Sequence, residues 1–342
     1  MANDKIQITR ENGELVEAQA PIIVSASRST DIPAFYANWF LHRLKIGYSA
    51  WTNPFNGVNS YVSYNKTRLI VFWSKNPQPL LNKDGCLDYL TSKNINCYIQ
   101  YTLNDYVNEK LESGVPSLQN RIDTFKRLVD RLGLGKVIWR FDPMILANNI
   151  TTDDLLTKAK FIGDQLKGYT EKMVFSYADI RTYRKVQYNL DRNAINYREF
   201  EEHDMHYIAK SLAELNSNWG YTLATCGEKI DLEQYGIEHN KCVDDDLMIK
   251  YFSHDTPLMD FLGVKIIPQD LFNPQATIIK DKTKKAKGQR TFCGCIASKD
   301  VGEYNTCPHL CEYCYANTSK ETALKNWQQH KESPIAETIT GK

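Results

Sequence analysis

The chain has 342 residues, a formal net charge of +1 and 24% charged residues, which is an ordinary balance for a globular protein. This charge excludes a strong bulk attraction to nucleic acid or membrane, although a local basic patch can still contact phosphate. The N-terminal segment lacks the apolar core of a signal peptide, and no apolar run is long enough to span a bilayer. We therefore expect a cytoplasmic protein with no membrane partner.

The chain begins with a predicted hairpin, because two short strand-like segments flank Asn12-Gly13, a favoured turn pair. From residue 21 onward, short apolar runs rich in β-branched and aromatic residues take over. The eight strand candidates read PIIVSAS, GYSAW, RLIVFW, NCYIQYT, KVIWRFD, KMVFSYA, GYTLATC and VKIIP. Their continuous apolarity is typical of strands buried on both faces of a parallel sheet.

Helical periodicity separates several of these runs. In residues 117–133 the apolar side chains recur on one face, with Ser117 as the expected N-cap and Gly133 as the C-terminal stop. Residues 151–168 and 200–220 repeat this pattern. About eight strands separated by helices or loops over roughly 250 residues predict a (β/α)8, TIM-like barrel. An open doubly wound sheet is the alternative.

The domain organisation follows from this prediction. We expect residues 1–275 to form the TIM-like barrel with its N-terminal hairpin, and residues 276–342 to form a basic linker and a C-terminal cysteine-cluster segment.

Polar residues follow most of the predicted strands. In a barrel these positions share one mouth, where active sites lie. The candidate catalytic residues are Arg28, Asp31, Lys75, Arg140, Asp142 and Glu228, the candidate cofactor contacts are Asn53 and Asn76, and Asn104 and Asp179 stand at equivalent positions. Taken singly, such residues are more often turn formers than functional groups.

Charge inside an apolar run marks the strongest of these candidates. Arg140 and Asp142 stand two residues apart on one predicted strand, so their side chains share a face as an ion pair or a substrate clamp. Lys75 follows the run FWS, where a desolvated lysine serves as an acid/base group or a phosphate contact, unless it is simply solvated at the rim.

The nine cysteines are the most informative residues. An odd number in a chain without an export signal favours metal binding over disulfides. Cys307, Cys311 and Cys314 have the spacing C-x3-C-x2-C, which can hold three corners of a four-iron four-sulfur cluster and leave one iron open. A structural zinc site completed by Cys293, Cys295 or His309 is an equally good interpretation of the spacing.

The segment TCPHLCEYCYAN resembles the cluster-binding loop of radical S-adenosylmethionine enzymes, most closely those of the spore photoproduct lyase-like branch. The whole chain also resembles an uncharacterised bacterial family, domain-of-unknown-function family eighteen-forty-eight. The segments that carry this second resemblance are SASRSTDIP, FWSKNP, WRFDP and the terminal cysteine segment.

The radical-enzyme resemblance implies that the three cysteines hold the cluster and that S-adenosylmethionine chelates the open iron. Its reductive cleavage would then give a 5′-deoxyadenosyl radical that abstracts hydrogen from a substrate. In those enzymes the loop usually lies near the N-terminus, whereas here only 28 residues follow Cys314. This predicts either a permuted barrel or a tail that folds over the barrel mouth, and in the second case an S-adenosylmethionine pocket is not required.

Four other cysteines predict a second centre. Cys226, Cys242, Cys293 and Cys295 are enough for a second cluster or a zinc site that links the tail to the barrel, or one of them completes the triplet. Cys86 and Cys97 have no partner spacing and are expected to be structural.

The stretch Lys280–Arg290 carries six cations and one acid. It is either a solvated linker or a contact to the phosphates of nucleic acid. Together these features predict an iron–sulfur enzyme with radical S-adenosylmethionine-type chemistry on a small-molecule or nucleotide substrate, served by an electron donor. The alternatives are an iron–sulfur redox protein without S-adenosylmethionine and a zinc-stapled nucleic-acid-binding protein.

Overall fold

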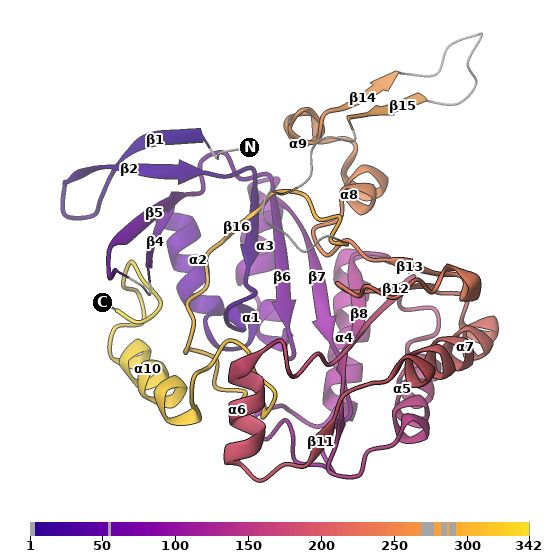
Figure 1. Ribbon diagram of the computed structural model, residues 1–342. Helices are drawn as coiled ribbons and strands as arrows, with labels where there is room; N and C mark the ends of the chain where they lie inside the picture. Colours follow the sequence, from indigo (N-terminus) through magenta and orange to yellow (C-terminus); the bar gives the residue numbers. More distant parts are fainter. Residues whose placement is uncertain (1–3, 54–55, 268–276, 282–285, 287–291, 342) are drawn as a thin grey trace.

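A computed structural model describes residues 4–53, 56–267, 277–281, 286 and 292–341. Its centre is an eight-stranded sheet in which every neighbouring pair is parallel (Figure 1). In their order across the sheet the strands are β13 (Ile237–His239), β12 (Thr222–Thr225), β10 (Lys172–Tyr177), β8 (Val137–Met144), β7 (Asn96–Thr102), β6 (Leu69–Ser74), β3 (Ile23–Ala26) and β16 (Lys299–Asp300).

The sheet is open, so the predicted TIM-like barrel is wrong. Within the described part of the chain, the end strand β13 pairs with β12 alone and the other end strand, β16, pairs with β3 alone. Among the described residues, no pairing joins the two ends of this sheet. The fold is therefore an open parallel α/β sheet, the broad class that includes the Rossmann-like folds.

Two of the eight predicted strands lie outside this sheet. GYSAW becomes β4 (Tyr48–Thr52), which pairs antiparallel with β5 (Asn59–Ser63), and VKIIP becomes β14 (Val264–Ile267), which pairs antiparallel with β15 (Thr277–Lys280). A short apolar run does not reveal which strand it pairs with. The two end strands, β13 and β16, are not predicted because they are too short to show a periodicity.

The predicted N-terminal hairpin is confirmed. It consists of β1 (Asp4–Thr9) and β2 (Leu15–Ala20), which pair antiparallel and join β5 and β4 in a four-stranded sheet. A two-residue pair, β9 (Leu146–Ala147) with β11 (Tyr197–Arg198), forms a separate small ladder.

The helices include those that periodicity predicts. Ser117 caps α4 through its side chain, and Gly133 ends that helix, as expected. The helices are α1 (Ile32–Phe35), α2 (Ala37–Ile46), α3 (Cys86–Ser92), α4 (Leu118–Leu132), α5 (Thr152–Leu166), α6 (Arg184–Arg192), α7 (Glu202–Trp219), α8 (Asp245–Phe252), α9 (Thr256–Leu262) and α10 (Lys320–Glu332), with 3-10 turns at Gln78–Leu81 and Glu233–Tyr235.

The two faces of the central sheet have different coverings. On β8, Val137, Trp139 and Phe141 join the large core under helices α2 to α5 and α7. Because side chains alternate along a strand, Ile138 and Arg140 point to the opposite face. On that second face, α8 and α9 cover the half that contains the amino ends of the strands. The other half of the same face, at the carboxyl ends of the strands, holds most of the candidate residues.

The C-terminal part of the chain is built into the body of the fold. The Trp39 indole N–H donates to the Ala336 carbonyl at 2.8 Å, and the backbone N–H of Ala50 donates to the Glu337 carbonyl at 2.8 Å, so residues after α10 pack on α2 and the small sheet (Figure 1). The Asp300 carboxylate accepts from Ser27 Oγ and from the Arg28 backbone N–H, each at 2.7 Å. These contacts fix the cysteine loop beside the carboxyl end of β3.

Candidate functional site

The carboxyl ends of the central strands carry a connected polar network. Asn104, after β7, donates from its side-chain amide to Tyr313 Oη at 3.2 Å and accepts from the Asp142 backbone N–H at 3.1 Å. Asn104 therefore joins the residues beside the cysteine loop to those around Arg140. The polar residues at the carboxyl ends of β6, β7 and β8 come together because parallel strands all end at the same edge of the sheet.

The cysteine loop, residues 304–317, is held by a buried histidine. His309 Nε2 lies 2.7 Å from Asp31 Oδ2, and its Nδ1 lies 3.1 Å from the Gly114 carbonyl oxygen. Both partner atoms are oxygens that can accept a hydrogen bond. Burial alone would raise the pKa of Asp31, but the hydrogen bond and charge of His309 lower it below its ordinary value. Both ring nitrogens are thus engaged away from any metal.

A glycine makes the closest approach to this loop. The Gly114 backbone N–H donates to the His309 carbonyl at 2.9 Å, and a Cβ at Gly114 would lie 2.6 Å from the Pro308 oxygen and 2.7 Å from the His309 oxygen. Those are backbone atoms that cannot rotate away, so a larger residue must push the two segments apart.

We expect Gly114→Ala to weaken the docking of the cysteine loop, with a loss of about 1–3 kcal/mol in the free energy of unfolding. Denaturant unfolding measures the loss, and the metal content of the variant should fall with it. Ser113→Ala, at the exposed neighbouring position, is the matched control. Equal stability and metal content of both variants would show that the close approach has no role.

The three loop cysteines are half-buried, and backbone N–H groups face two of their sulfurs. Cys307 Sγ accepts from the N–H groups of His309 and Asp31, and Cys314 Sγ accepts from those of Ala316 and Asn317. Desolvation raises the pKa of all three loop thiols. Hydrogen bonds to sulfur favour thiolates, whereas desolvation opposes three separate negative charges, and a bound metal would resolve this conflict.

A cation lies beside the loop. Lys75 Nζ donates to Glu112 Oε1 at 2.7 Å and to Tyr313 Oη at 3.0 Å, and its charge also acts on the nearby Cys311 thiol. Although burial raises the pKa of Glu112, Lys75 and Arg121 lower it to about 2, so this carboxylate is ionised at neutral pH. Lys75 is therefore a buried, paired cation rather than a solvated rim residue.

Two guanidinium groups flank one indole ring on the opposite side of the network. Arg28 lies 5.3 Å and Arg140 lies 5.4 Å from the centre of the Trp73 ring. Arg28 Nε and Trp73 Nε1 are both buried and have no hydrogen-bond partner among the described residues. Buried donors normally find acceptors, so this arrangement suits a ligand with a carboxylate or phosphate group.

Arg140 is held by several groups. Its Nε donates to Asp142 Oδ2 at 3.0 Å, and one terminal nitrogen donates to Gln100 Oε1 at 3.1 Å and to Cys242 Sγ at 3.2 Å. Ser176 donates to the other oxygen of Asp142. The sequence prediction that Arg140 and Asp142 form an ion pair on one face of a strand is confirmed.

Glu228 lies close to this pair with a perturbed carboxyl group. Burial raises its pKa to about 7, the Asp142 and Asp179 charges add to the rise, and the Tyr177 backbone N–H, which donates to Glu228 Oε1 at 2.9 Å, lowers it. A carboxyl that titrates near neutrality can both donate and accept a proton at working pH.

The same pKa predicts a pH effect on stability. Between pH 4.5, the ordinary pKa, and about pH 7, the folded chain keeps a proton at Glu228 that the unfolded chain has lost, so stability falls as the pH rises through this window. We expect Glu228→Gln to be more stable than the natural chain by about 1–3 kcal/mol at pH 8, and equally stable at pH 4. Denaturant unfolding at both pH values tests this.

A neighbouring substitution provides the control. Asp179→Asn removes one of the charges that raise the pKa of Glu228, so it should move the pH dependence to lower pH without removing it. If Glu228→Gln leaves the slope of stability against pH unchanged, the carboxyl does not titrate near neutrality.

The four remaining cysteines predicted as metal ligands come together on the second face of the sheet. Cys226 Sγ and Cys242 Sγ are 3.3 Å apart, and the Cys295 thiol is hydrogen-bonded to those of Cys242 and Cys293. By contrast, Cys86 and Cys97 are buried in the helix-covered core, where a structural role was expected.

Other candidates lie at the edge of this network or away from it. Asn53 follows β4 in the small sheet, so the reason for expecting it at the shared edge does not hold. The Asn76 backbone N–H donates to Ser74 Oγ at 2.9 Å, and Asp179 is exposed. Most of the basic stretch Lys280–Arg290 lies outside the described residues.

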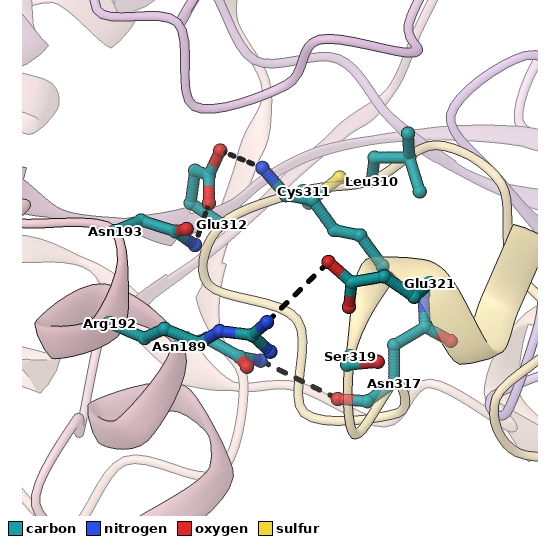
Figure 2. Close-up of a pocket in the computed structure, with 10 residues that line it drawn as sticks. Asn189, Arg192, Asn193, Leu310, Cys311, Glu312, Asn317, Ser319 and Glu321 are labelled. Atoms are coloured by element: carbon teal, nitrogen blue, oxygen red, sulfur yellow. Dashed lines mark hydrogen bonds and ion pairs between the residues drawn. The ribbon is translucent and has the colours of Figure 1, made fainter.

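A surface pocket opens beside the cysteine loop (Figure 2). It lies between the end of α6 and the start of α10, and Cys311 lines it. Asn193 Nδ2 donates to Glu312 Oε2 at 2.7 Å, and Arg192 lies 3.5 Å from Glu321 across the opening. The cysteine loop is therefore reached from outside through a small polar opening.

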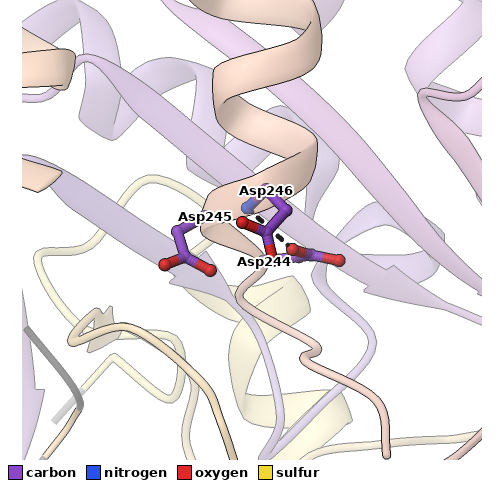
Figure 3. A group of neighbouring side chains, drawn as sticks. All are labelled: Asp244, Asp245 and Asp246. Atoms are coloured by element: carbon purple, nitrogen blue, oxygen red, sulfur yellow. Dashed lines mark hydrogen bonds between the residues drawn. The ribbon is translucent and has the colours of Figure 1, made fainter. Parts of the chain in front are cut away.

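Three aspartates at the start of α8 lie close together (Figure 3). Asp244 caps the helix and lies 3.4 Å from Lys172, while Lys241 lies 2.8 Å from Asp245 and Lys280 lies 2.7 Å from Asp246. Because lysines neutralise these carboxylates, capping and ion pairs account for the cluster.

Sequence reasoning missed several residues of the network. Glu112 stands in a loop without a motif, and Trp73 and Gln100 look like ordinary strand residues. Asp300 gives no signal because it contacts the β3 end from about 270 residues away in the sequence. Only the tertiary structure reveals such partners.

Comparison with known proteins identifies the family. A family model described as "Domain of unknown function (DUF1848)" matches residues 23–316, so the chain belongs to this family, as its motifs suggested. No curated protein and no solved structure matches the chain. Within the described residues, no helix combines the length and apolarity needed to cross a lipid bilayer.

Proposed function

We propose that this member of the DUF1848 family is an iron–sulfur enzyme with radical S-adenosylmethionine-type chemistry. Cys307, Cys311 and Cys314 would hold a four-iron four-sulfur cluster with one open iron. The substrate would be an anionic small molecule, or a nucleotide, bound near Trp73 and Arg140.

One observation carries the proposal: three half-buried cysteines share one loop, and each predicted fourth ligand is engaged elsewhere. Both ring nitrogens of His309 contact Asp31 and Gly114. Cys293 and Cys295 belong to the Cys242 group. A triplet with an open fourth position suits a cluster that binds a small molecule at its free iron.

The spacing of the sulfurs supports a cluster over a single zinc ion. Zinc with Zn–S bonds of about 2.3 Å needs sulfurs about 3.8 Å apart. In the described part of the chain, the three loop sulfurs are not all within 4.8 Å of one another. A cluster binds each cysteine at a different iron, which requires wider separations.

The chain's own residues supply the remaining functions. When bound, the reduced cluster would deliver an electron to a molecule held at its open iron. Lys75 would offset the negative charge of the loop, and Arg28, Trp73 and Arg140 would bind and orient an anionic substrate. Glu228 would hold or release a proton beside it. An electron donor could approach the loop where Cys311 lines the outer pocket.

A specific experiment tests the role of S-adenosylmethionine. The anaerobically purified, reduced protein should show an electron paramagnetic resonance signal that changes when S-adenosylmethionine is added, and should slowly form 5′-deoxyadenosine and methionine. Arg131→Ala, at an exposed position on α4, is a control for non-specific effects. An unchanged signal and no cleavage would instead leave the second candidate, an iron–sulfur redox protein, which the presence of two cysteine groups in one chain favours.

A further inference from the structure

The second face of the sheet contains four cysteines that the proposed reaction does not use. Cys226 follows β12, Cys242 follows β13, and Cys293 and Cys295 precede β16. Three chain segments, separated by many residues, thus bring their thiols to one place.

The thiols form a continuous series of contacts. Cys226 Sγ lies 3.3 Å from Cys242 Sγ, which is far longer than a disulfide bond of about 2.05 Å. Cys242 contacts Cys295, and Cys295 contacts Cys293. The two sulfurs are thus neighbours without a bond between them, and they need to separate only to about 3.8 Å to bind one metal atom together.

Nitrogen donors point at these sulfurs. The backbone N–H groups of Cys242 and Val243 donate to Cys295 Sγ at 3.2 and 3.4 Å. Arg140 and the Asn240 side-chain amide donate to Cys242 Sγ at 3.2 and 3.3 Å. Such donors would stabilise the negative charge of metal-bound cysteine sulfurs.

A chain segment is docked to complete the group. The Ile296 backbone N–H donates to the Val243 carbonyl at 3.0 Å, and a Cβ at Gly294 would lie 2.9 Å from Lys241 Cγ. Residues 293–296 therefore lie directly on the loop that carries Cys242, and the tail reaches this place before it forms β16.

From this geometry we propose that Cys226, Cys242, Cys293 and Cys295 form a four-thiolate metal site, separate from the cluster triplet. In the described part of the chain no three of these sulfurs lie within 4.8 Å of one another, so a single zinc ion does not fit them as they stand. The arrangement suits a two-iron two-sulfur cluster with two cysteines on each iron. Arg140 joins this site to Asp142, so the metal centre would form the floor of the proposed substrate region.

The test uses the full-length Cys307→Ser, Cys311→Ser, Cys314→Ser variant, purified anaerobically, so that failure of the proposed cluster does not affect the result. We expect it to retain about two iron and two sulfide ions per chain. About one zinc ion per chain without sulfide would contradict the two-iron centre. Adding Cys293→Ser, a change at a half-buried position, should remove this metal, whereas adding Cys97→Ala should not.

A second measurement separates metal loss from misfolding. Removing the metal from the triple variant with a chelator should lower its melting temperature, and restoring the same metal should raise it again. A folded triple variant that holds no metal would overturn the proposal. So would a Cys226–Cys242 disulfide found by mass spectrometry in protein that contains no metal.

Discussion

Replacing Cys311 with serine should reduce the cluster iron and sulfide of the anaerobically purified chain at least roughly tenfold. Cys311 is one of only three thiols on the loop, its segment pairs with Glu112, and Lys75 acts on its charge. Loss of this ligand leaves only two cysteines on the loop to hold the cluster. Iron, sulfide and the visible absorbance of the cluster measure the effect.

The matched control is Cys97→Ala. Cys97 is a cysteine that packs in the helix-covered core, away from the loop. Its replacement should cost some stability and leave the iron and sulfide content unchanged. Equal cluster content in Cys311→Ser and in the natural chain would remove Cys311 from the ligand set.

Arg140→Met should lower the free energy of unfolding by about 3–5 kcal/mol, because it leaves the Asp142 carboxylate without its main cationic partner. The Arg140 side chain is 3% exposed and that of Asp142 is 21% exposed, so water can replace the lost contact only in part. Arg140→Met with Asp142→Asn should recover part of the loss. Denaturant unfolding of all four combinations gives the coupling between the two residues.

A surface pair provides the comparison. Arg131 and Asp88 lie 2.7 Å apart with side chains that are about 40% exposed, and Arg131→Met should cost under about 1 kcal/mol. If both arginine substitutions cost the same, burial does not strengthen the Arg140–Asp142 pair. If the double variant is no more stable than Arg140→Met alone, the carboxylate is not the source of the loss.

The sequence predicts the local elements of this fold better than their assembly. The Asn12-Gly13 hairpin, helix α4 with its caps and the strand runs of β3, β6, β7, β8, β10 and β12 follow from periodicity and turn chemistry. Closure into a barrel does not follow, because it depends on pairing between end strands. β16 has only two residues and reaches its place through contacts of Asp300 with a segment far away in sequence.

In the candidate site, too, contacts within one strand could be predicted and contacts between distant segments could not. Arg140 with Asp142 could be predicted because two residues two apart on one strand must share a face. The pairing of Lys75 with Glu112, and the contact of His309 with Asp31, could not, because each joins a strand end to a loop without any regular spacing. Cysteine spacing identifies the triplet, but only the fold separates the triplet from the Cys242 group.

The most direct test of the central claim is the iron and acid-labile sulfide content per chain, compared between the anaerobically purified natural protein and the Cys307→Ser, Cys311→Ser, Cys314→Ser variant. The account predicts a difference of about four iron and four sulfide ions per chain, because the triplet holds one four-iron cluster. No difference in iron and sulfide, or a difference in zinc alone, would contradict it.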